Sequence, residues 1–160
     1  MSRDTALTGA AGEHYVAFRL AASGYAVGIT TRGTRNVDMV AANPDTGKSI
    51  SIDTKTMRKA FQHDSSDSWW KWRMGIHAYQ KLKYLKQNDF FYILVDLKDD
   101  PTKTPDIFIV PSNEMQNLLE PHPKGVNPAS GNLTDVWCVI YDKDASKYNE
   151  KWDIVNKALI

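Results

Sequence analysis

The chain has 160 residues, of which 42% are hydrophobic, 24% charged and 11% aromatic, a composition that excludes the disordered, collagen-like and coiled-coil classes. Its one cysteine, Cys138, excludes an intramolecular disulfide framework and a cysteine-rich zinc module. No apolar stretch approaches roughly 18 residues, and the N-terminal residues lack the plan of a signal peptide. We therefore expect a single cytoplasmic domain over residues 1–160.

The net charge of +1 hides an uneven distribution along the chain. Residues 1–54 are neutral, residues 55–86 carry +6 and residues 87–160 carry −5. A basic middle segment favours an anionic partner, although the whole-chain value argues against one. Chance clustering on solvated faces would give the same distribution, so charge alone does not decide.

The first third of the chain predicts one helix followed by three strands. Residues 6–22 are rich in alanine and leucine and stop at a Ser-Gly pair, which indicates a helix. Residues 25–30, 36–43 and 48–56 are short β-like runs. The last two are joined by residues 44–47, Pro-Asp-Thr-Gly, whose strong turn chemistry predicts a hairpin.

The remainder alternates between helices and strands. Residues 57–74 are polar and irregular with a patch of tryptophans, and residues 76–87 predict a second helix. The near-continuous apolar runs 90–97 and 107–110 are typical of strands covered on both faces. A short helix, a loop, a strand and a final helix follow over 112–119, 120–133, 136–141 and 144–158. The order αβββαβαβα indicates a mixed α/β fold around one central sheet flanked by helices.

The predicted hairpin concentrates charged residues on one face. Its turn places Asn43 opposite Lys48, and the same register places Asp38 opposite Asp53 with Cβ atoms roughly 4.5–5.5 Å apart. Alternation puts Asp53 and Lys55 on the same face. Opposed carboxylates destabilise a hairpin unless a cation offsets them, and Mg²⁺ binds through one or two carboxylates plus waters. A solvated outer face without a metal ion is the alternative.

Glu13 lies on the first predicted helix among small and apolar neighbours one turn away. A carboxylate on a packing face needs a cation or hydrogen-bond donors, which a metal ion at the hairpin would supply. The alternative is that Glu13 lies at the edge of the apolar stripe and reaches water.

Glu13, Asp38 and the triplet Asp53-Thr54-Lys55 together resemble the motif of the PD-(D/E)XK nuclease superfamily, which has the restriction-endonuclease-like fold. The segment 12–41 is most similar to the N-terminal part of archaeal-type Holliday-junction resolvases and related small nucleases. The resemblance covers residues 9–56, and beyond residue 86 it rests only on the order of strands and helices. One departure is Val37, which stands at the position of the proline in the superfamily name.

The resemblance implies a metal-dependent endonuclease that hydrolyses DNA phosphodiester bonds in repair, recombination or defence. It implies that Asp38, Asp53 and the Thr54 carbonyl ligate a catalytic Mg²⁺, for which Mn²⁺ would substitute, and that Glu13 completes or tunes the site. Lys55 would orient or activate the attacking water and stabilise charge on the phosphate. The number of metal ions stays open, and a homodimer is expected by analogy only.

Basic and aromatic side chains around the hairpin predict contacts with DNA. Arg32 and Arg35 precede Asp38 and would contact the phosphate backbone. Tryptophans 69, 70 and 72 are interleaved with cations, a pattern that suits phosphate pairing and base stacking, although core packing or a dimer contact would explain them equally. Gln80 and Tyr84 match a helix motif of the RecB-like branch. The predicted nucleic-acid contacts are Arg32, Arg35, Arg58, Lys59, Lys71, Arg73, Gln80 and Tyr84.

Two other functions remain open at this point. One is a catalytically silent nucleic-acid-binding or protein-assembly module of the same fold. The other is a protein-binding α/β domain whose acidic residues are merely solvated.

Overall fold

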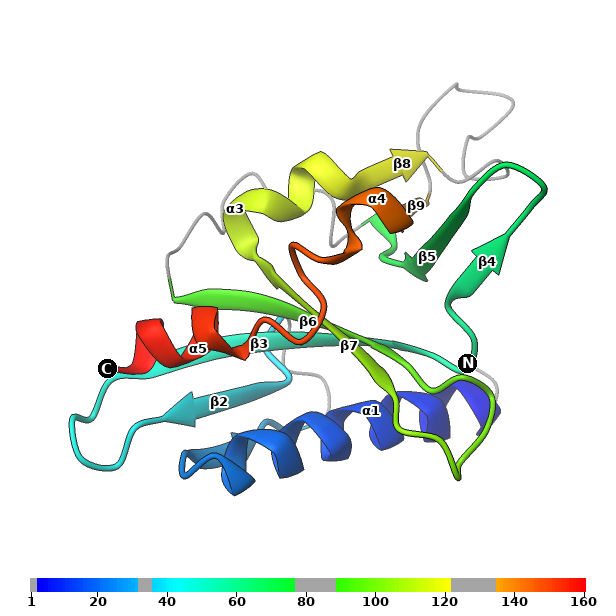
Figure 1. Ribbon diagram of the computed structural model, residues 1–160. Helices are drawn as coiled ribbons and strands as arrows, with labels where there is room; N and C mark the ends of the chain where they lie inside the picture. The colour runs from blue at the N-terminus through cyan, green and yellow to red at the C-terminus, as the bar shows by residue number, and fades with distance from the viewer. Residues whose placement is uncertain (1–2, 32–35, 77–88, 122–134) are drawn as a thin grey trace.

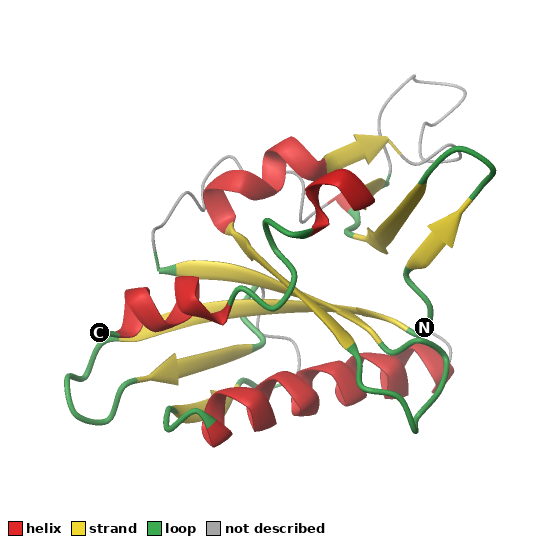
Figure 2. Ribbon diagram, viewed as in Figure 1, coloured by secondary structure: helices red, strands yellow, loops and turns green. Residues whose placement is uncertain are grey.

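The computed structural model describes residues 3–31, 36–76, 89–121 and 135–160, which form two β-sheets with flanking helices (Figures 1 and 2). Nearly all of the helix expected over 76–87 lies outside these residues. In this described part of the chain, no helix has both the length and the apolar content that crossing a membrane requires.

The first sheet is mixed and has the strand order β1-β2-β3-β6-β7. The β3 and β6 strands are parallel, and every other neighbouring pair is antiparallel. Its strands are β1 (Ala26–Ile29), β2 (Met39–Ala42), β3 (Ser49–Met57), β6 (Phe90–Asp96) and β7 (Asp106–Pro111). This arrangement confirms a mixed α/β architecture.

A second, antiparallel sheet shows that the expectation of one sheet and of an irregular segment 57–74 is wrong. Its strand order is β4-β5-β9-β8, with β4 (Phe61–His63), β5 (Ser68–Arg73), β8 (Leu119–Pro121) and β9 (Val136–Tyr141). Side chains of β5 alternate between the two faces of this sheet, and Trp70 and Trp72 point inward to the core. Trp69, Lys71 and Arg73 lie on the outward face, and this mixture of polar and aromatic residues is why the segment reads as irregular.

Within the described residues, the helices are α1 (Arg3–Ala22), α3 (Ser112–Met115), the 3₁₀ turn η1 (Gln116–Leu118), α4 (Asp142–Ala145) and α5 (Trp152–Leu159). The single helix expected over 144–158 is therefore wrong, because the chain between α4 and α5 pairs with β7. Ile109 N–H donates to the Tyr148 carbonyl, and Glu150 N–H donates to the Ile107 carbonyl, each at 2.9 Å. The predicted order αβββαβαβα is therefore wrong in detail: in the described residues five strands follow α1, two strands precede α3, and two strands lie between η1 and α4.

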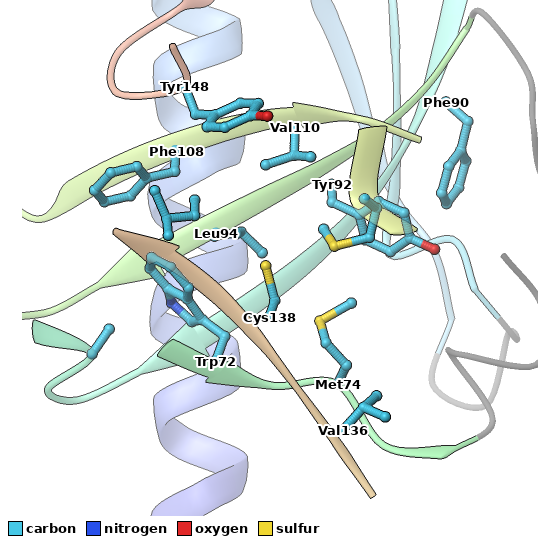
Figure 3. Close-up of a cluster of buried hydrophobic side chains, with 13 residues drawn as sticks. Trp72, Met74, Phe90, Tyr92, Leu94, Phe108, Val110, Val136, Cys138 and Tyr148 are labelled. Carbon is cyan, nitrogen blue, oxygen red and sulfur yellow. The ribbon is translucent and has the colours of Figure 1, made fainter. Parts of the chain in front are cut away.

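Two apolar cores lie on opposite faces of the first sheet. Val16 and Leu20 of α1 and Val155 of α5 pack on one face. On the other face, side chains of β5 and β9 such as Trp72 and Cys138 pack on β6 and β7 (Figure 3). The interior residues of β6 and β7 are buried, which confirms the prediction of strands covered on both faces.

Helix α1 approaches the sheet closely at Gly12. Its Cα lies so near β3 that a Cβ atom at this position would overlap the Oγ1 atom of Thr56. Thr56 is β-branched and has little rotamer freedom to move aside. Glycine at this position therefore sets how deeply α1 packs beside the second half of β3.

We expect Gly12→Ala to lower the free energy of unfolding by about 1–3 kcal/mol, because α1 must shift to relieve the overlap. Gly9→Ala on the same helix is the matched control, since its Cβ would meet no atom within 4 Å. That substitution should stabilise the protein by about 0.5–1 kcal/mol through helix propensity. Urea unfolding measures both, and equal effects of the two substitutions would contradict this account.

Candidate active site

The β2–β3 hairpin has the register expected from its turn. Met39 pairs with Ile52 and Ala42 with Ser49, and Asn43 N–H donates to the Lys48 carbonyl at 2.9 Å. Gly47 has φ 74°, a conformation that glycine adopts at little cost. The turn chemistry and the apolar alternation therefore predict the pairing correctly.

The register shifts at Asp38, so the expectation that Asp38 lies directly opposite Asp53 is wrong. Asp38 N–H donates at 2.8 Å to the carbonyl of Ile52, the residue that already faces Met39. Two residues of one strand thus oppose one of the other, as in a β-bulge. The carboxylate of Asp38 accepts a hydrogen bond from Thr54 N–H at 2.7 Å. Asp38 is therefore attached to the middle residue of the Asp53-Thr54-Lys55 triplet.

Asp53 and Lys55 lie on the same face of β3, as alternation predicts. Lys55 Nζ lies 2.7 Å from Asp53 Oδ1, and the two side chains are 27% and 8% exposed. A nearly buried carboxylate is costly without a compensating charge, and Lys55 provides that charge here.

Tyr92 is a neighbour of Asp53 that the sequence analysis does not identify. It faces Asp53 in the parallel β3–β6 register and is buried. Burial raises the pKa of the Tyr92 hydroxyl, and the negative charge of Asp53 raises it further. The phenol is therefore a neutral potential donor beside the carboxylate. Its position depends on which residues of two distant strands face each other, for which the sequence contains no local signal.

A groove of about 850 Å³ brings Glu13 and Lys55 together with residues of the second sheet. Glu13 is half-buried at the edge of the packed line formed by Gly12, Val16 and Leu20, as in the alternative interpretation above. Arg73 of β5 and Trp137 of β9 line the opposite side of the groove. Trp137 was not among the predicted contacts.

The other predicted DNA contacts are scattered. Arg58 forms ion pairs with Asp4 and Asp99 and lines a separate pocket of about 560 Å³. Lys59 lines a third pocket, beside Phe61 and Trp70. Lys71 lies over the ring of Trp137, with Nζ 4.9 Å from the ring centre. Four predicted contacts lie outside the described residues: Arg32, Arg35, Gln80 and Tyr84.

The carboxylates of Asp38 and Asp53 are the residues at this site that fit a hard divalent cation. Asp53 directly precedes Thr54 in β3, the Asp38 carboxylate accepts the hydrogen bond of the Thr54 N–H, and Mg²⁺ needs only one or two carboxylates besides waters. Across the described ranges, no three or more His, Cys, Asp or Glu side chains are grouped as metal ligands. The structure thus does not group Glu13 with both aspartates as a three-carboxylate metal site.

Comparisons with protein-family models, with curated proteins and with solved structures found no match to this chain.

We expect Asp38→Ala to lower the free energy of unfolding by about 1–3 kcal/mol in metal-free buffer, because the buried Thr54 N–H loses its acceptor. Asp38→Asn keeps a side-chain carbonyl oxygen and should cost less. Asp45→Ala, at an exposed position in the turn of the same hairpin, is the control and should change stability by no more than about 0.5 kcal/mol. Chemical unfolding measures all three variants. An Asp38→Ala variant with an unchanged free energy of unfolding would disprove a structural role for this hydrogen bond.

Proposed function

We propose that the protein is a metal-dependent endonuclease that hydrolyses DNA phosphodiester bonds, on a restriction-endonuclease-like version of the α/β fold. One observation supports this above all: Asp38 is hydrogen-bonded to Thr54, between Asp53 and its ion-pair partner Lys55. This hydrogen bond holds Asp38 against the strand residue between Asp53 and Lys55, and these three residues, with Glu13 in the same groove as Lys55, are the set that the PD-(D/E)XK resemblance implies.

Asp38 and Asp53 would hold the Mg²⁺ ion, which supplies a Lewis acid for the phosphate and lowers the pKa of a bound water. The chain's own residues then have separable tasks. Asp38 and Asp53 bind the ion, and the hydrogen bond from Thr54 fixes the direction of the Asp38 carboxylate. Lys55 offsets the charge of Asp53 and, from the same groove as Glu13, orients the attacking water and stabilises negative charge on the phosphate.

The groove supports a nucleic-acid substrate because it has cations on both sides. Lys55 lies on the β3 side, and Arg73, whose side chain is 70% exposed, lies on the β5 side. Arg73 pairs with Asp135 through Nε, and the other nitrogens of its guanidinium can still donate to a phosphate. A strand of DNA in this groove would thus pass between two positive side chains.

We expect the wild-type protein to cleave plasmid or branched DNA with Mg²⁺ or Mn²⁺ and to stop in EDTA. Lys55→Ala and Asp53→Ala should lower the rate by about 10²–10³-fold, as for the loss of one charge-stabilising group in other active sites. Gel electrophoresis measures the rate, and circular dichroism checks that each variant is folded.

Lys98→Ala is the matched control for this experiment. Lys98 also pairs with an aspartate, Asp106, at 2.8 Å and is similarly exposed, but it lies outside the groove. This variant should retain wild-type activity. Wild-type protein that binds DNA but never cleaves it with either metal ion would instead identify a catalytically silent binding module.

A further inference from the structure

The outward face of the second sheet combines aromatic and basic side chains with one acidic residue, Glu120 of β8, which pairs with Trp137 and accepts a hydrogen bond from the Tyr141 hydroxyl at 2.9 Å. Inward residues of β5 and β9 belong to the core, so the alternate residues point away from it. On this face Trp69 pairs with Tyr141, Lys71 with Val139, and Arg73 with Trp137. The rings of Trp69 and Tyr141 have centres 6.5 Å apart, and Lys71 lies over the ring of Trp137. We call these residues the aromatic-basic face: Trp69, Lys71, Arg73, Trp137 and Tyr141.

This face has the chemistry of a platform for unpaired bases. Every base presents a π-face that stacks on an aromatic ring, while nearby cations follow the phosphates. Trp69 and Trp137 lie four residues apart along the paired strands, about 13 Å. Lys71 lies between them and Arg73 at one end. Tryptophan, tyrosine and arginine are also enriched at protein–protein interfaces, whereas lysine is depleted there, so a tryptophan-dependent dimer is the competing outcome of the binding experiment.

The aromatic-basic face is continuous with the candidate active site. Arg73 and Trp137 belong to the face and also line the groove that contains Lys55 and Glu13. A strand stacked on Trp69 and Trp137 would therefore extend directly into that groove. Base-paired DNA would present only its backbone, because its bases are already stacked on one another.

We propose that the aromatic-basic face binds single-stranded DNA by base stacking and delivers the strand to the groove, so that the substrate has unpaired nucleotides beside the cleaved phosphate. This inference rests on the proposed function for the cleavage step. The binding step is separate, since it needs no metal ion and can be measured when cleavage is absent.

The test measures binding in EDTA by fluorescence anisotropy, with a labelled oligothymidine and with a labelled duplex of matched length. We expect the wild type to bind the single strand at least about tenfold more tightly than the duplex. Trp69→Ala and Trp137→Ala should each weaken single-strand binding by about tenfold, the usual size of one lost stacking contact. Trp69→Phe and Trp137→Phe keep an aromatic ring and should retain most of the affinity, which also covers the case in which an alanine variant does not fold.

Phe18→Ala is the control, because Phe18 is an aromatic residue on α1 with 62% exposure and lies outside the aromatic-basic face. It should bind as the wild type does. Duplex bound as tightly as the single strand, or alanine variants with unchanged affinity, would overturn the inference even if the protein cleaves DNA. A tryptophan-dependent dimer with no effect on DNA binding would also overturn it. Tryptophan-dependent single-strand binding without cleavage would support the inference and reject only the nuclease.

Discussion

The candidate site depends on the mismatch in length between β3 and β2, because β2 pairs with only the first four residues of β3. β3 has nine residues, of which Ser49–Ile52 pair with β2 and Ser51–Met57 pair with β6. From Asp53 onward, one edge of β3 has no paired strand within the described chain, and its backbone groups need other partners. The Asp38 carboxylate accepts the hydrogen bond of the Thr54 N–H, and α1 approaches Thr56 at Gly12. Acidic and basic side chains lie close together here because this edge of β3 is contacted by both α1 and the segment that contains Asp38.

The second sheet connects the core to the groove. On its inner face, Trp72 packs edge-on against Phe108 and donates from Nε1 to the Val95 carbonyl at 2.9 Å, which ties β5 to β6. Its outer face carries Lys71 and Arg73, which alternate with those inward residues. The β5 strand therefore stabilises the fold with one set of side chains and, with the other, presents Arg73 to the groove that Lys55 lines. This packing and the hydrogen bond to Val95 position Arg73 and Trp137 relative to the first sheet.

Local patterns explain which predictions were correct. The turn at 44–47 and the alternation of apolar residues gave the β2–β3 register, because both act over a few residues. They failed at Asp38, where a bulge shifts the pairing by one residue. They also failed for β4 and β5, because the lysine and arginine on the outward face of β5 resemble residues of a loop until the partner strand β9 is known. The sequence predicted Glu13 as a site residue, but its position at the edge of the packed stripe depends on how α1 packs against Thr56.

By itself, the sequence determined the hairpin, the common face of Asp53 and Lys55, and the buried strands β6 and β7, because turn chemistry and alternation are properties of neighbouring residues. Only the tertiary structure decided that the Asp38 carboxylate binds Thr54 N–H, that Tyr92 faces Asp53, and that one groove joins Glu13 and Lys55 to Arg73 and Trp137. These contacts join segments far apart in the chain. These contacts depend on strand pairing and on the packing of helices against the sheet, which minimise the free energy of the whole molecule rather than of any one segment.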